Sequence, residues 1–122
     1  MENNKLHTFV GFSIRTGKYK TGLNACYTLK RADLVLLCPT ASINTKKEAF
    51  KLAKKLNAEI FITKLNLEDL THKDNVKIMA IFDKKLTRAI LDNCREYLEN
   101  FNQEIINGWR KENNSTSFWK HF

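Results

Sequence analysis

Residues 34–38 form a short, continuous apolar run, Leu-Val-Leu-Leu-Cys, that ends at Pro39, the only proline of the chain. A run of this length without a polar position is typical of a strand that is buried on both faces of a sheet. We predict two more strands, at residues 59–63 and 77–82. Strands of this kind need helices on both sides, so the sequence predicts a single-domain α/β protein with a three-layer α/β/α sandwich.

Helix-like segments alternate with these runs. Residues 4–16 place apolar side chains about three or four positions apart, and Gly17 follows in the manner of a helix stop. A short edge strand is predicted at residues 18–20. A second helix is then predicted over residues 21–31, with Thr21 as its N-cap.

The third and last helices have recognisable start signals. Thr45 and Glu48 match a capping box at the start of the third helix. A single helical turn is predicted at residues 66–70. Asp83 is the predicted N-cap of a long last helix, whose apolar positions step by three or four as far as Ile105. The third helix has a basic outer face, and we expect its inner face to consist of Ala49, Phe50, Ala53 and Leu56.

A chain of 122 residues suits one domain with its own core. We place this domain at residues 4–106 and treat residues 107–122 as a C-terminal tail. Two interpretations of the tail stay open, because exposed aromatic side chains favour association: it folds back over an apolar patch, or it binds a protein partner. The tail contains four large aromatic residues among polar ones, Trp109, Phe118, Trp119 and Phe122.

The positive charge is concentrated in the first half of the chain. Residues 1–64 contain 12 Lys and Arg against 4 Asp and Glu, whereas residues 65–122 contain 9 of each class, which leaves the formal net charge of +8 in the first half. Such an asymmetry is expected of a protein that binds nucleic acid or another anionic surface. The alternative is a solvated, lysine-rich surface without a ligand.

Three of the four glycines lie within residues 11–22, where they alternate with basic residues. Glycine permits close backbone approach, and a helix that starts after such a turn presents N–H groups and a positive dipole end to an anion. A phosphate-bearing partner is therefore expected. The stretch is no nucleotide-binding P-loop, because Gly11 and Gly17 enclose five residues instead of four and Lys18 is followed by Tyr19.

Cysteine and histidine spacing does not predict a catalytic or metal site. The three cysteines lie far apart in apolar patterns and are predicted to be buried thiols of a cytoplasmic protein. The three histidines have neither metal-binding nor nucleophile spacing and are interpreted as surface residues. We therefore expect no enzyme activity, no cofactor, no metal and no membrane span.

Several blocks in order along the chain resemble a known family. Residues 9–18, the pair Thr21 and Gly22, residues 34–37 and residues 41–47 are similar to the small bacterial YlxQ-type members of the kink-turn-binding ribosomal protein family, of the L-seven-Ae and L-thirty-e type. The resemblance covers about residues 6–91. It implies an α/β/α sandwich around a four-stranded mixed sheet. It also implies a ribonucleoprotein that grips RNA at the start of the second helix.

The resemblance also suggests which residues would contact RNA. Gly22 and Asn24 match the family's Gly-x-Asn-Glu-like segment, which reads sheared G·A pairs, and Lys18 matches a flanking basic residue. The chain departs from the family at Ala25, Thr28 and Thr71. The complete set of predicted RNA-binding residues is Arg15, Lys18, Lys20, Thr21, Gly22, Asn24, Lys30, Arg31, Thr40, Ala41 and Ser42.

Two functions of different classes follow from these patterns. The first is a non-enzymatic cytoplasmic protein that docks structured RNA, such as ribosomal RNA, against the first turn of its second helix. Phosphates would be neutralised by lysines and a base edge would be read by Asn24. The second is a protein-interaction module in ribosome or transcription assembly, which would use the long last helix and the aromatic tail.

Overall fold

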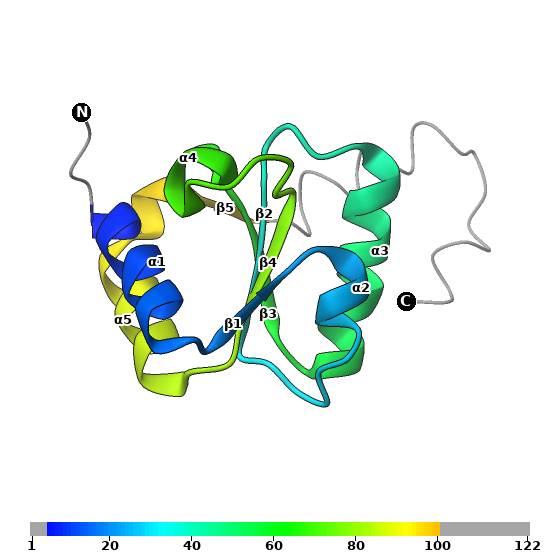
Figure 1. The fold of residues 1–122 in the computed structure, drawn as a ribbon, viewed down its shortest axis with the longest axis horizontal. Coiled ribbons are helices and arrows are strands. Elements are labelled where there is room, and N and C mark those ends of the chain that lie inside the picture. The colour runs from blue at the N-terminus through cyan, green and yellow to red at the C-terminus, as the bar shows by residue number, and fades with distance from the viewer. Residues whose placement is uncertain (1–4, 101–122) are drawn as a thin grey trace.

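A computed structural model of the chain describes residues 5–100 (Figure 1). Helices and strands alternate along most of this length, as the sequence predicts. In chain order the elements are α1 Lys5–Thr16, β1 Tyr19–Thr21, α2 Leu23–Cys26, β2 Leu34–Leu37, α3 Ile43–Leu56, β3 Glu59–Thr63, α4 Leu67–Thr71, β4 Ile78–Ile81, α5 Lys84–Asn93, the short 3₁₀ helix η1 Arg95–Tyr97, and β5 Leu98–Asn100.

The strands form one mixed sheet of five strands in the order β1-β4-β2-β3-β5. Strands β2 and β3 are parallel, while β4 is antiparallel to both β1 and β2, and β5 is antiparallel to β3. Strands β1, β2 and β3 therefore all run in the same direction. The expectation of four strands is wrong, because β5 adds a fifth strand along the outer edge of β3.

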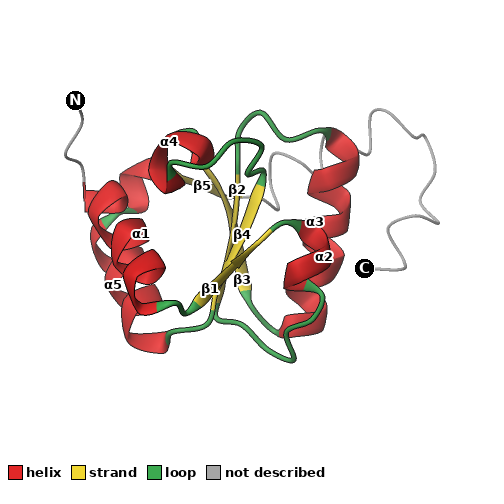
Figure 2. Cartoon of the chain, in the orientation of Figure 1, coloured by secondary structure: helices red, strands yellow, loops and turns green. Residues whose placement is uncertain are grey.

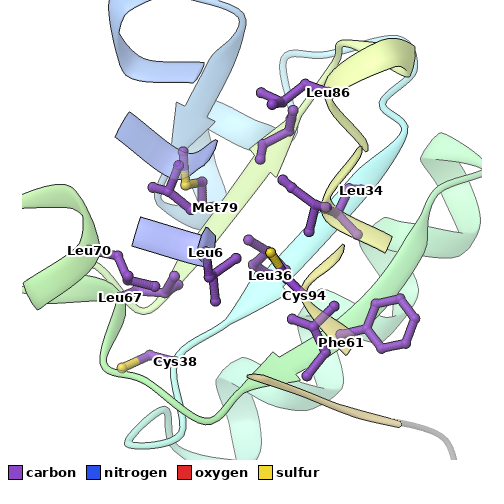
Figure 3. Packing of buried hydrophobic residues seen from close by; sticks show 14 of the residues in the cluster. Leu6, Leu34, Leu36, Cys38, Phe61, Leu67, Leu70, Met79, Leu86 and Cys94 are labelled. Carbon is purple, nitrogen blue, oxygen red and sulfur yellow. The ribbon is translucent and has the colours of Figure 1, made fainter. Parts of the chain in front are cut away.

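Helices cover both faces of this sheet (Figure 2). Helices α1, α4 and α5 lie on one face, where their apolar side chains meet those of β2 and β4 in the first core cluster (Figure 3). Helices α2 and α3 lie on the other face around a second cluster. The protein is a small, mixed α/β domain.

Strand β2 shows why its apolar run contains no polar position. Leu34 and Leu36 point into the first core cluster, whereas Val35 and Leu37 point into the second. All four side chains are buried, so each face of the strand needs apolar residues. The prediction of a strand buried on both faces is confirmed.

The segment before β1 also follows the prediction. Helix α1 ends at Thr16, and Gly17 adopts a left-handed conformation with φ of 75°. Its N–H donates to the carbonyl groups of Ser13 and Ile14 at 3.0 and 3.2 Å, which closes the last turn of the helix. The predicted edge strand forms one residue later than expected, at β1.

The second helix is much shorter than predicted. Helix α2 ends at Cys26 instead of residue 31, and its N-cap is Gly22, since Thr21 belongs to β1. The Thr28 hydroxyl donates to the Ala25 carbonyl at 2.6 Å, which helps to replace the next helical turn by a tight turn. The chain then leads toward the start of β2.

The third helix is capped three residues earlier than predicted. The side chain of Ser42 accepts a hydrogen bond from the N–H of Thr45 at 3.1 Å, so Ser42 is the N-cap and Thr45 is the third helical residue. The inner face consists of Ala49, Leu52, Ala53 and Leu56. Phe50, which was expected there, is only partly buried.

The last helix begins as predicted but ends early. Asp83 accepts a hydrogen bond from the N–H of Leu86 at 3.1 Å, which confirms it as the N-cap. Helix α5 stops at Asn93, and the chain turns through η1 into β5. The N–H of Lys64 donates to the Tyr97 carbonyl at 2.7 Å, so this turn is fixed against the end of β3. Pairing with the open edge of β3 replaces continued helix here.

One of the two remaining predictions, on the cysteines, falls within the described residues, and the other, on the tail, does not. The three cysteines are buried free thiols, as expected. The aromatic tail, residues 107–122, and the end of the predicted domain at residue 106 lie outside the described residues.

Candidate nucleic-acid interface

The direction of the strands separates the predicted RNA-binding residues into two groups. Because β1, β2 and β3 run the same way, they all end at one edge of the sheet and all begin at the opposite edge. We call these the carboxyl edge and the amino edge. Lys18 precedes β1 and Gly22 follows it, so about 13 Å of extended chain separates the two residues, at about 3.3 Å per residue.

The carboxyl edge brings together the start of α2 and the loop after β2. The N–H of Gly22 donates to the Ile78 carbonyl at 3.1 Å, and the N–H of Cys38 donates to the Lys77 carbonyl at 2.9 Å. Both segments are therefore fixed against the same end of β4. Asn24 is exposed at this edge. The carboxyl edge therefore brings Thr21, Gly22 and Asn24 to the same end of the sheet as Thr40, Ala41 and Ser42.

Three of these six residues have structural roles that limit their availability. The Lys77 ammonium donates to the Thr40 hydroxyl at 2.9 Å, and Ser42 caps α3. Ala41 is buried, with 7% of its surface exposed. Asn24 is the side chain at this edge best placed to contact a ligand, since it is polar and exposed.

The helix that follows Gly22 is short, so its dipole is weak. Gly22 has φ of 88°, a conformation that suits glycine, but α2 contains only four residues. The aligned peptide dipoles that attract an anion to a helix start need a longer helix. The predicted extent of the second helix, to residue 31, is therefore wrong, and α2 supplies little of the dipole that was expected to attract a phosphate.

The amino edge collects the other predicted cations. Lys18, Lys30 and Arg31 line an open groove of about 600 Å³ together with Lys84 and Lys85, and the groove also contains Asp33 and Asp83. We call it the basic groove. Five cations therefore face two carboxylates, one of which, Asp83, already accepts a hydrogen bond as the N-cap of α5. Within residues 5–100, the ammonium groups of Lys18 and Lys30 have no carboxylate at ion-pair distance.

Lys84 and Lys85 were not among the predicted site residues. They occupy the first turn of α5, a turn that contains no acidic residue. The positive end of the helix dipole makes this an unfavourable position for a cation. Two adjacent lysines directly after a predicted N-cap are a sequence signal that could have identified them.

The two remaining predicted cations, Lys20 and Arg15, lie outside the basic groove. Lys20 is exposed in the middle of the edge strand β1, where it pairs with Ala80. Arg15 lies on α1, and its guanidinium carbon is 5.6 Å from the centre of the Phe12 ring. Neither residue lines the basic groove.

The thiol of Cys26 donates a hydrogen bond to the backbone carbonyl of Lys20 at 3.6 Å. Burial raises its pKa to about 11, partly offset by a hydrogen bond from the Ala80 backbone and by the charge of Lys20. Burial also raises the pKa of Cys94. Both thiols therefore stay protonated at neutral pH, which suits the predicted structural role and gives no nucleophile.

Two histidines that are far apart in the sequence meet in the structure. The rings of His7 and His72 lie with their centres 5.4 Å apart and their planes nearly perpendicular. In the part of the chain that the structure describes, no three His, Cys, Asp or Glu side chains are grouped so that they could hold a metal. None of the helices within residues 5–100 is both long and apolar enough to cross a membrane. His121 lies outside these residues.

Comparison with known proteins gives a likeness to solved structures. No protein-family model matches the chain, and no curated protein matches it. A solved structure of a protein with unknown function from Bacillus halodurans C superimposes with a TM-score of 0.62 at 19% identity, covering 74% of this chain and 96% of that one. The likeness shows the fold alone.

Proposed function

We propose that the protein binds structured RNA through cations at the amino edge of its sheet and through Asn24 at the carboxyl edge. The observation that carries this proposal is the basic groove, where Lys18, Lys30, Arg31, Lys84 and Lys85 outnumber two carboxylates. Phosphate oxygens are the natural partners of such a surface, because Lys and Arg neutralise the backbone of nucleic acids without reading its sequence.

An extended polyanion explains this arrangement better than a small anion does. The groove is open, and its cations come from three separate segments: the start of β1, the turn before β2 and the start of α5. Asn24 lies at the opposite edge, two residues beyond Gly22, which is about 13 Å from Lys18 along β1 by the strand rise. One RNA helix is wide enough to contact both edges, with phosphates at one and a base edge or 2′-hydroxyl at the other.

The resemblance to the kink-turn-binding ribosomal proteins supports the same class of function. Helices on both faces of the sheet accord with the three-layer α/β/α sandwich that this resemblance implies. We therefore propose a cytoplasmic ribonucleoprotein component that docks ribosomal or similarly folded RNA and has no enzymatic activity. Asn24 and Gly22 would lie at the family's RNA-contacting position.

The alternative of a protein-interaction module has less support. It relied on a long last helix, but α5 ends at Asn93. Its other element, the aromatic tail, lies outside the described residues. RNA binding therefore remains the leading proposal.

A pair of double variants tests the proposal. Lys30→Ala with Lys84→Ala removes two charges from the basic groove, and Lys51→Ala with Lys64→Ala removes two exposed lysines that do not line it. We expect the groove variant to bind a folded ribosomal RNA fragment more weakly and with a smaller salt dependence, since each lost phosphate contact reduces the log–log slope by roughly 0.7–0.9.

The control variant should bind like the unmodified protein at every salt concentration. Equal losses in the two variants would mean that net charge alone attracts the RNA. Absence of binding by the unmodified protein at low salt would overturn the proposal.

A further inference from the structure

An apolar groove lies directly beside the basic groove. Side chains of α1 and α5 line a hollow of about 560 Å³ that includes Phe9, Phe12 and Leu86. Three residues, Lys18, Asp83 and Lys85, line both this hollow and the basic groove. The two grooves therefore form one continuous surface at the amino edge, apolar at one end and cationic at the other.

Phe12 is the distinctive residue of the apolar groove. It is one of only two large hydrophobic side chains that are exposed within residues 5–100; 43% of its surface is open, and the other is Ile43 at 38%. The guanidinium of Arg15 lies 5.6 Å from the centre of its ring. Nucleobases stack both on exposed aromatic rings and on arginine guanidinium groups, and here the two groups lie together, with the Arg15 guanidinium over the Phe12 ring.

We infer that an unpaired stretch of RNA binds across this surface, with one base stacked on Phe12 and its flanking phosphates on Lys18 and Lys85. This inference rests on the proposed RNA-binding function and adds a second mode of contact to it. The site lies at the amino edge, away from Gly22 and Asn24; it shares Arg15 and Lys18 with the predicted RNA-binding residues, and Phe12 and Lys85 are new to it.

Charge complementarity decides the occupant. The rim of the apolar groove contains Arg15, Lys18 and Lys85 against one carboxylate, and that carboxylate, Asp83, is held as the N-cap of α5. A ligand that suits both ends must combine a flat apolar face with closely spaced negative charges. A single-stranded nucleotide chain has this combination at every residue, because each base adjoins its own phosphates.

The test uses a fluorescein-labelled ten-nucleotide oligouridylate and a blunt RNA duplex of the same length as probes. Phe12→Leu keeps an apolar helix-forming residue and removes the ring, while Phe12→Tyr keeps the ring. Ile43→Ala is the matched control, since it removes the other exposed large hydrophobic side chain. Thermal unfolding of each variant checks that the domain is intact.

We expect Phe12→Leu to weaken binding of the single strand by about 5- to 100-fold and to leave duplex binding unchanged, in line with the energy of base–aromatic stacking. Phe12→Tyr and Ile43→Ala should bind the single strand as the unmodified protein does. Arg15→Lys keeps the charge and removes the planar group, so it should weaken binding of the single strand and leave binding of the duplex unchanged.

Three other results would overturn the inference, and they are distinguishable. If Phe12→Leu binds the single strand normally while Lys18→Ala with Lys85→Ala does not, the phosphates are bound without stacking, and the proposed function survives. If the unmodified protein binds neither these probes nor a folded ribosomal RNA fragment, the proposed function fails as well. Binding of an acidic peptide by Phe12 in place of RNA would assign the groove to a protein partner.

Discussion

The backbone N–H of Phe82 donates to the carbonyl of Lys18 at 3.2 Å. This hydrogen bond fixes the start of β1 beside the end of β4, and α5 begins two residues after Phe82. Lys18 is thereby held next to Lys84 and Lys85, although a large part of the chain separates them in sequence. The basic groove at the amino edge depends on this antiparallel pairing.

Reversing the charge at Lys84 should raise the stability of the protein and weaken its binding of RNA. Lys84 is the first residue of α5, so Lys84→Glu places a negative charge at the positive end of the helix dipole. We expect the free energy of unfolding to rise by about 0.3–1 kcal/mol at low ionic strength. Affinity for RNA should fall at the same time, as measured by urea denaturation and fluorescence anisotropy.

Lys64→Glu is the control for this exchange, because Lys64 follows β3 and lies neither at a helix start nor in the basic groove. It should change neither stability nor affinity by a comparable amount. A loss of affinity as large as that of Lys84→Glu would show that overall charge, and not the groove, governs binding.

Ser42 should contribute to stability as the N-cap of α3. Ser42→Ala removes the acceptor for the Thr45 N–H and is expected to lower the free energy of unfolding by about 0.5–2 kcal/mol. Ser42→Asp preserves a capping oxygen and should be close to the unmodified protein. Thr45→Ala should cost less than Ser42→Ala in the same chemical denaturation experiment. The opposite ranking would contradict the role of Ser42 and support Thr45 as the N-cap, as in the predicted capping box.

Asn24 offers a test of base-edge recognition at the carboxyl edge. Asn24→Ala should reduce the affinity for a preferred folded RNA by about 1–3 kcal/mol, because an amide can donate to and accept from one base. Affinity for an unstructured RNA should change much less. Equal losses on both RNAs, measured by anisotropy titration, would leave Asn24 a structural residue only.

The Cys26 thiol predicts a pH dependence of stability. Its pKa is about 11 in the folded protein and close to the ordinary 9.0 when unfolded. Between these values the folded state holds more protons than the unfolded state, so the free energy of unfolding falls as pH rises from about 9 to 11. Cys26→Ala should lack this part of the decline, while Cys38→Ala should keep it. Identical pH profiles for all three proteins would contradict the prediction.

The sequence alone determined which segments are buried and where several elements begin. The run at residues 34–38 predicted a central strand, since a short apolar run that ends at a proline is typical of a strand buried on both faces and is too short for a buried helix. Gly17 and Asp83 marked a helix end and a helix start, because the backbone geometry at each depends on the local residue type.

Tertiary structure decided the features that depend on distant partners. The periodicity of Cys94 and Tyr97 fitted a helix, yet the chain leaves the helix because the open edge of β3 offers backbone hydrogen bonds to β5. Likewise, Lys18 and Arg31 come together with Lys84 only because the strand order brings the start of β1 and β2 to the start of α5. Periodicity and capping describe neighbours along the chain, whereas a groove is made by segments that meet only after the sheet has formed.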